Sequence, residues 1–339
     1  MNIGSKAVAL TVGIASLAIA TAASGNDSTA ELAAGGLVMT KSPAIEMRAE
    51  DLYISTKQVR VRYRFANTSD KDVTVTVAFP MPDITTHGFD DTISIPTQDP
   101  VNIMGFSTTV DGQPVKAEVE RKAIANGVDQ TAYLTSLGVP LAPHLQATND
   151  FIQALPRATR DALVKRGLAV IDQYGDATTM TDHWEATWTL KTTYYWRQTF
   201  PAGKELAVEH QYTPSVGGTV GTAIGTPGYG KEPEFAARRK HYCIDDGFMA
   251  AVEKTKKPGN DYPPLYEERV EYILSTGANW KAPIGDFRMV VDKGDAANII
   301  SFCADGVTKI SPTQFEVRHT NFTPTGDVSI LILEPAPVQ

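Results

Sequence analysis

Histidine is the side chain through which this chain could most readily move protons at neutral pH, and the sequence holds six in 339 residues. Two short groups place a histidine beside carboxylates, which could bind a metal ion or form an acid–base pair. They are His87 with Asp90 and Asp91, and Asp182–His183 with Glu185. Both sets are also typical of solvated loops, so we assign neither of them a catalytic role.

The sequence contains none of the motifs that mark common catalytic or cofactor sites. There is no Gly-x-Ser-x-Gly, and the nearest run, from Gly105 to Thr109, lies in a predicted strand without the sharp turn that such a nucleophile needs. No His-Glu-x-x-His occurs. The glycine-rich run from Gly225 to Lys231 is followed by Glu232, where a phosphate-binding loop has Ser or Thr. We therefore predict no catalytic residue, no metal and no cofactor.

The candidate ligand or cleft residues are His183, Trp184, His210 and His241. His210 shares the alternation of Leu206, Val208 and Tyr212, whose side chains face the same way along a strand. That phase predicts a buried, hydrogen-bonded and neutral imidazole rather than a catalytic base. The alternative is that His210 lines a cleft as a ligand or a base, since perturbed histidines gather at functional sites.

The stretch from Asp182 to Thr213 must position these side chains. Even positions from Trp184 to Phe200 are mostly apolar and odd ones mostly polar, which is the period of a strand with one buried face. The alternation resumes at Leu206 after a short turn and predicts an antiparallel hairpin. Its aromatic face could stack on sugar rings if it were exposed. We predict that this face is buried in the core instead, because a sheet with both faces in water would bury too little apolar surface to be stable. The aromatic residues of that face are Trp184, Trp188, Tyr194 and Trp196.

Most of the remaining chain also predicts strands. The runs Val59–Phe65 and Val73–Phe79 alternate around a turn at Asn67–Asp70, which predicts a second hairpin. The pair Asp111–Gly112 predicts a tight type I′ turn in a third hairpin. Short strands return towards the C-terminus, and the run from Val328 to Leu333 is apolar enough to be covered on both faces.

The predicted fold is mainly β, with two β-sandwich domains and a small helical insertion in the first. Residues 25–216 form the first domain, and helical spacing at about 130–175, with Gly167 or Gly175 as a cap, marks the insertion. Residues 217–339 form the second, with a short helix at Asp246–Lys254 near its start. The boundary rests on the glycine-rich stretch Val216–Gly230 and on the return of alternation after it.

Residues 1–24 predict a signal peptide, because one charge at Lys6 precedes an apolar run and small residues follow it. We expect an exported protein, periplasmic or secreted, with no membrane span after signal removal. The two cysteines, Cys243 and Cys303, then predict one disulfide, the alternative being two buried thiols. A net charge of −8 argues against a nucleic-acid partner.

Several runs resemble known families. The turn "Asn-Thr-Ser-Asp-Lys" at 67–71, the strand end "Ala-Phe-Pro-Met-Pro" at 78–82 and "Phe-Pro-Ala-Gly-Lys-Glu-Leu" at 200–206 resemble the vault and inter-alpha-trypsin (VIT) domain, which implies a β-sandwich. The whole mature chain resembles the exported bacterial family called domain of unknown function 4424. That resemblance is carried by "Asn-Asp-Ser-Thr" at 26–29, "Gly-Gly-Leu-Val" at 35–38, "Tyr-Tyr-Trp-Arg" at 194–197 and "Thr-Gly-Ala-Asn-Trp-Lys" at 276–281. It implies a compartment and a fold, and no activity.

Two function classes remain open. The first is a non-catalytic envelope protein that binds a protein, a glycan or another ligand through a sandwich face or a cleft. The second is a hydrolase-type enzyme whose histidines and carboxylates come from distant parts of the sequence. An apolar or aromatic groove would favour binding. The enzyme would be favoured by a cavity that holds carboxylates and at least two of His87, His183, His210 and His241.

Overall fold

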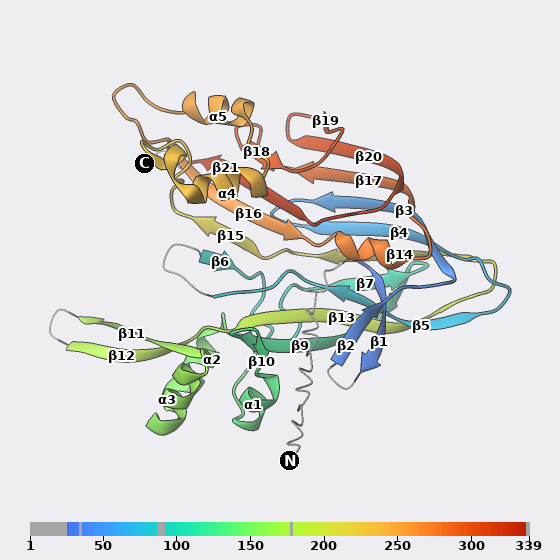
Figure 1. Ribbon diagram of the computed structural model, residues 1–339, viewed down its shortest axis with the longest axis horizontal. Coiled ribbons are helices and arrows are strands. Elements are labelled where there is room, and N and C mark those ends of the chain that lie inside the picture. The colour runs from blue at the N-terminus through green and yellow to red at the C-terminus, as the bar shows by residue number, and fades with distance from the viewer. Residues whose placement is uncertain (1–25, 34–35, 87–91, 177–178, 337–339) are drawn as a thin grey trace, which may run out of the picture.

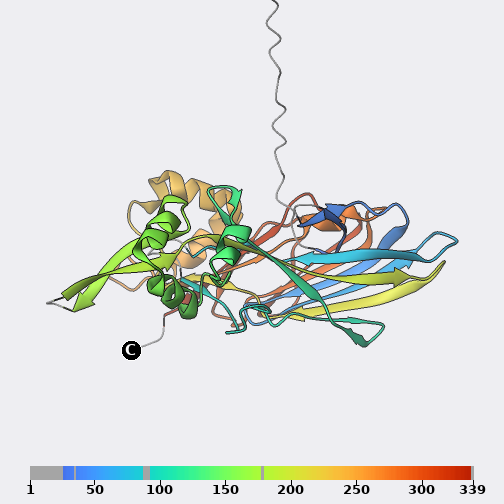
Figure 2. The same cartoon turned by 90° about the horizontal axis from the view of Figure 1, so that it is seen from below.

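The chain is mainly β, as predicted. The computed structural model describes residues 26–33, 36–86, 92–176 and 179–336, and their strands form four sheets (Figure 1). Most helices gather at one end of the molecule and the long strands extend towards the other (Figure 2). None of the described helices combines the length and the hydrophobicity needed to cross a membrane. The predicted signal peptide at 1–24 and the group of His87, Asp90 and Asp91 lie outside the described residues.

The largest sheet combines strands from both halves of the chain. Its eight strands follow the order β19-β20-β17-β3-β4-β14-β7-β8, and β17 pairs parallel to β3. The predicted division into two sandwiches near residue 216 is therefore wrong, because alternation identifies a buried face but not the strand that pairs with it. The bounds are β3 (Ile45–Ile54), β4 (Val59–Asn67), β7 (Ser107–Val110), β8 (Gln113–Val115), β14 (Glu205–Tyr212), β17 (Ile284–Asp292), β19 (Thr308–Lys309) and β20 (Gln314–Phe322).

Two smaller sheets share one core with this large sheet. Tyr63 of β4, Trp196 of β13 and Tyr272 of β16 come from the three different sheets and belong to the same buried cluster. The six-stranded sheet has the order β10-β9-β13-β5-β1-β2, and the five-stranded sheet β18-β21-β16-β15-β6. Their bounds are β1 (Ser28–Ala33), β2 (Gly36–Thr40), β5 (Val73–Pro80), β6 (Thr92–Ser94), β9 (Glu118–Ala125), β10 (Val128–Asp129), β13 (Thr189–Phe200), β15 (Val216–Thr219), β16 (Leu265–Tyr272), β18 (Ile299–Phe302) and β21 (Val328–Pro335).

Two of the three predicted hairpins are wrong. β4 and β14 lie in the large sheet, whereas β5 and β13, to which their turns connect them, lie in the six-stranded sheet. Each turn therefore crosses the core as an arch, and the Asn67 side chain joins the two arches by donating to the carbonyls of Lys71, at 2.7 Å, and Phe200, at 2.8 Å. Sequence periodicity is the same for a hairpin and an arch. The third hairpin, β7–β8, is confirmed, with positive φ at Asp111 and Gly112.

The five-stranded sheet is covered on both faces. Ile330 and Ile332 of β21 point into the shared core, while Leu331 and Leu333 pack against α4 (Pro233–His241) and α5 (Asp246–Glu253). Burial of the last strand on both faces is therefore confirmed, and α5 agrees with the predicted short helix. The predicted disulfide between Cys243 and Cys303 is also present, and it ties the loop between these helices to the end of β18.

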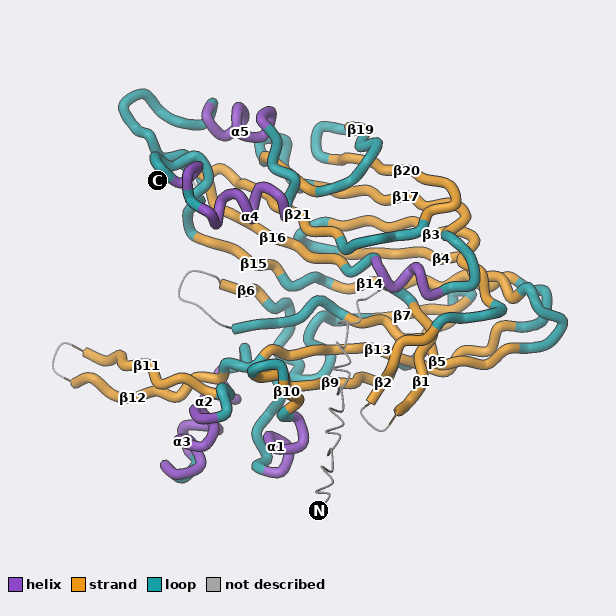
Figure 3. The backbone as a smooth tube through the Cα atoms, in the orientation of Figure 1, coloured by secondary structure: helices purple, strands orange, loops and turns teal. Residues whose placement is uncertain are grey.

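A helical insertion interrupts the first half, as predicted, but it ends earlier. Three helices pack around Trp184 and Trp188 in a second core: α1 (Thr131–Ser136), α2 (Gln146–Ala154) and α3 (Arg157–Lys165). Gly167 follows α3 with a φ of 71°, which agrees with the predicted cap. Beyond it the helical prediction is wrong, because the chain forms a two-stranded ribbon of β11 (Ala169–Asp176) and β12 (Thr179–Ala186) that extends away from the body (Figure 3).

Trp188 and Trp196 are both buried, so the aromatic face is core. We expect Trp188→Ala and Trp196→Ala each to lower the free energy of unfolding by about 3–5 kcal/mol, because each change leaves a cavity where a large ring was packed. Denaturant unfolding of the purified variants measures this, with Tyr262→Ala, at an exposed tyrosine, as the control. Variants as stable as the parent would contradict the core assignment.

Candidate functional site

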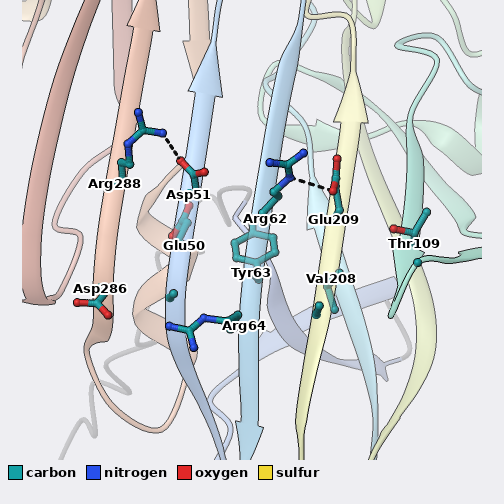
Figure 4. Close-up of a pocket in the computed structure, with 13 residues that line it drawn as sticks. Glu50, Asp51, Arg62, Tyr63, Arg64, Thr109, Val208, Glu209, Asp286 and Arg288 are labelled. Atoms are coloured by element: carbon teal, nitrogen blue, oxygen red, sulfur yellow. Dashed lines mark hydrogen bonds and ion pairs between the residues drawn. The ribbon is translucent and has the colours of Figure 1, made fainter. Parts of the chain in front are cut away.

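A hollow of about 480 Å³ lies on the outer face of the eight-stranded sheet. On β4 the buried residues Val61 and Tyr63 alternate with Arg62 and Arg64, so the arginines project from the face that turns away from the core. Side chains of β17, β3, β4, β14 and β7 surround the hollow (Figure 4). We call it the sheet-face hollow.

One row of charged side chains across this face is fully paired. Arg288 of β17 lies 2.8 Å from the Asp51 carboxylate of β3, and Arg62 of β4 lies 3.0 Å from Glu209 of β14 (Figure 4). The register places Arg288 beside Asp51, Asp51 beside Arg62 and Arg62 beside Glu209. Charge therefore alternates along the row, and its partners are already supplied by the protein.

The next row is open. Its register is Asp286, Ala49, Arg64 and Ala207, so small side chains stand on both sides of the arginine. Among the described residues, Arg64 forms one ion pair, with Glu205 at 3.8 Å, and more than half of each side chain is exposed. In the part of the chain that the structure describes, Asp286 forms no ion pair. The row thus offers one loosely paired guanidinium and one unpaired carboxylate, separated by β3.

The open row can bind charged groups. Asp286 and Arg64 lie two strands apart, about 10 Å between their backbones, and the small side chain of Ala49 lies between them. A guanidinium recognises a carboxylate or phosphate, and a carboxylate recognises an ammonium group. The residues that line the sheet-face hollow include four carboxylates, Tyr63 and Thr109, and neither a histidine nor a cysteine.

A second polar group lies in the interior, at the start of the described chain. Asn26, Asp27 and Ser28 are completely buried, and we call these three residues the N-terminal anchor. The Asn26 amide side chain donates to both carboxyl oxygens of Glu50, at 3.1 and 3.0 Å, and its oxygen accepts from the Tyr63 hydroxyl.

The N-terminal anchor also binds the second half of the chain. The Trp280 indole donates to the Asp27 carbonyl at 2.7 Å, and Asn279 donates to the Ser28 hydroxyl at 2.9 Å. The Asn26 backbone exchanges hydrogen bonds with the Thr276 hydroxyl. The runs 26–29 and 276–281, which carried the family resemblance, are therefore in contact with one another.

His210 belongs to this interior group. It is completely buried, and its Nε2 lies 3.0 Å from the Asp27 carboxylate, so the predicted burial and hydrogen bonding are confirmed. The rings of Tyr63, Phe79, Phe106 and Trp196 surround the imidazole at centroid distances of 5.0 to 5.6 Å. A base in this position has no contact with a substrate in solution, which argues against a catalytic role.

The other candidate residues are not brought together. His183 and Trp184 are neighbours on β12, where the His183 ring stacks on Tyr174 and the Trp184 ring is buried under Arg160. His241 ends α4 and lies 3.6 Å from Glu271. No group of three or more His, Cys, Asp or Glu among the described residues could hold a metal ion. A ligand role for these residues stays a prediction.

The sequence alone does not predict the sheet-face hollow, because the hollow is formed by small side chains beside Arg64 and not by a recognisable motif. The alternating arginines of β4 are visible in the sequence, but their neighbours across the sheet depend on strand order. Ala49 and Ala207 carry no chemical signal of their own, and they matter only because the register places them beside Arg64. Asn26 and Asp27 were noticed only as part of a family motif.

Residues 25–331 match the family model described as a domain of unknown function, DUF4424. The chain belongs to this family. The resemblance of its first half to the VIT domain stays a prediction, and the comparison with curated proteins finds no match. Among solved structures, a crystal structure from Legionella pneumophila, described as a candidate nutrient binding protein, is similar at 18% identity and a TM-score of 0.44. The similarity covers 91% of this chain and 70% of that one.

Burial makes Glu50 a weaker acid than an exposed glutamate. Desolvation raises its pKa from the ordinary 4.5 to about 8, against the opposing hydrogen bonds from Asn26, and the neighbouring Asp27 adds to the rise. Between pH 4.5 and about pH 8 the Glu50 carboxyl is ionised in the unfolded chain but stays protonated in the folded chain. The folded state therefore binds more protons, and this group makes stability fall as the pH rises, by up to about 1.4 kcal/mol per pH unit.

We expect Glu50→Gln to remove this pH dependence, because the amide keeps the shape of the side chain without ionising. The free energy of unfolding of the variant should exceed that of the parent by an amount that grows from pH 5 to pH 8. Denaturant unfolding across this range measures the difference, with Glu31→Gln, at an exposed site on β1, as the control. Parallel pH profiles for the parent and Glu50→Gln would contradict the assignment of a buried neutral carboxyl.

Proposed function

We propose that this chain is an exported, non-catalytic binding protein of the cell envelope, periplasmic or secreted, and that the sheet-face hollow holds a small zwitterionic ligand. The observation that carries the proposal is the open row of Arg64 and Asp286 beside a row in which every charge is paired. A free amino acid or a short peptide carries the two complementary charges. The volume of about 480 Å³ lies within the usual range for small-molecule sites.

The compartment is supported by the disulfide. Cysteine pairs persist in oxidising surroundings, and both cysteines of this chain are paired with one another. A glycan is less well supported as the ligand, because all four tryptophans are buried and none can stack on a sugar from outside. The proposed partner is therefore a charged small molecule rather than a carbohydrate.

The enzyme alternative loses its main support. It required a cavity with carboxylates and at least two of the candidate histidines. Of those that the structure describes, His183, His210 and His241, none lines the sheet-face hollow or the hollows beside α5 and β15. The His210–Asp27 pair has the composition of an acid–base dyad, but it is sealed inside the core. Its residues hold the interior together instead of facing a substrate.

Calorimetric titration with free L-amino acids and dipeptides at neutral pH tests the proposed ligand class. We expect at least one of these probes to bind the parent, and Arg64→Ala and Asp286→Asn each to weaken that binding by about tenfold or more, since each removes one charge-assisted contact. Arg318→Ala is the matched control, because this arginine lies on the same face of β20, outside the hollow, and pairs with Glu316.

Two results would contradict the proposal. One is the absence of binding by any of the zwitterionic probes at millimolar concentration. The other is binding that Arg64→Ala and Asp286→Asn leave unchanged, because the ligand would then lie elsewhere on the molecule.

A further inference from the structure

The outer edge of β11 differs from every other sheet edge in the described part of the chain. The three larger sheets end in strands of five residues or fewer: β10 and β2, β19 and β8, and β18 and β6. A short edge strand offers little backbone for a further strand to pair with. β11 has eight residues and forms one side of a two-stranded ribbon.

The opposite edge of the same ribbon is closed by the protein itself. On β12 the backbone N–H of Trp184 donates to the Gln153 side chain, at 3.2 Å, and that of Ala186 to the Asn149 side chain, at 3.0 Å. Both side chains come from α2, which runs along this edge. The ribbon has therefore one edge that is covered by side-chain amides and one that is not.

The backbone of β11 points outwards at alternate residues. Opposite residues in an antiparallel pair direct their N–H and C=O groups either both inwards or both outwards. Trp184 pairs with Ile171, and Asp182 pairs with Gln173, so Ile171 and Gln173 turn their backbone groups to the outer edge. The Gln173 N–H confirms this direction, because it bonds at 2.8 Å to the Asp172 carboxylate and not to β12.

Four of the side chains around this edge are apolar or aromatic and exposed. Val170, Ile171 and Tyr174 of β11 are 49%, 41% and 46% exposed, and Met180 of β12 is 62% exposed. β11 contains neither lysine nor proline, the residues that most often protect a free edge. A ribbon of two strands is also marginal on its own, so a third strand would stabilise it.

Charge around the edge is acidic. Asp172 shares one face of the ribbon with Val170 and Tyr174, and Glu185 stands opposite Val170 on the same face. The carboxylates of Glu185, Asp172 and Asp150 all act on the Tyr174 hydroxyl and raise its pKa, after desolvation as the first cause. An incoming strand would place its own side chains directly beside these acids.

We propose that the outer edge of β11 receives an extended segment of a partner protein by strand addition, with a basic side chain beside Asp172 and apolar side chains beside Val170 and Tyr174. The basic group releases the Asp172 carboxylate from the Gln173 N–H, which then pairs with the added strand. A second copy of this chain fits less well. If the β11 strands of two copies paired antiparallel so that Val170 of each stood opposite Tyr174 of the other, the two Asp172 carboxylates would stand opposite one another, which is destabilising.

Fluorescence anisotropy with two labelled synthetic peptides tests the proposal on the full mature chain. Both peptides are eight residues of alternating valine and threonine, one with a central lysine and the other with a central glutamate. We expect the parent to bind the lysine peptide at least about tenfold more tightly than the glutamate peptide, and Asp172→Lys to reverse this order. Ile171→Pro removes an outward N–H at an edge, where proline is tolerated, and should weaken binding of the lysine peptide by about tenfold or more.

The melting temperature of each variant shows whether the body of the protein is intact, and Ile171→Thr is the matched control that keeps the N–H. Equal affinity of the parent for the two peptides, or binding that Ile171→Pro leaves unchanged, would overturn the proposal. It would also be overturned if the parent sediments as a dimer that Ile171→Pro dissociates, since the occupant of the edge would then be a second copy.

Discussion

The rest of the structure depends on the burial of a polar segment, Asn26–Ser28, between the eight-stranded sheet and residues 276–280. Buried amides and carboxyls are costly unless each finds a partner, and here the partners come from β3, β4, β14 and residues 276–280. Both halves of the chain must therefore be in place before the segment is satisfied. This requirement explains why strands from both halves of the chain share the largest core.

The sequence predicted the local structure well and the assembly poorly. Many strand positions, the helices up to Gly167 and the Asp111–Gly112 turn follow from short-range patterns, and the disulfide follows from the predicted compartment and the even number of cysteines. The structure confirms these features. Strand partners do not follow from such patterns. The alternation of β4 and β5 is the same whether they pair with each other or face each other across a core. Strand pairings, such as the parallel pairing of β3 with β17 and the pairing of β6 with β15, show that the halves are joined.

Ionisable side chains are stabilised in different ways on the two faces of the eight-stranded sheet. Inside, burial raises the pKa of Glu50 to about 8, so that one carboxyl is kept neutral beside Asn26. Outside, arginines and carboxylates alternate and pair across strands, except in the row of Arg64 and Asp286. The interior group could be anticipated from the phase of His210, whereas the outer site required the register of four strands. The proposed function therefore rests on the exposed row of Arg64 and Asp286, whereas the interior group stabilises the fold that presents this row.

Native-state hydrogen exchange, read by mass spectrometry on the parent and on Asp27→Ala, tests the central claim most directly. The substitution leaves His210 without its carboxylate, and a buried group left unpaired costs about 1–3 kcal/mol. If one core depends on the N-terminal anchor, amides of β4 and of β17 should lose protection together and by the same free energy. Loss of protection in β4 alone, with β17 unchanged, would show that the two halves are stabilised separately and would contradict the account.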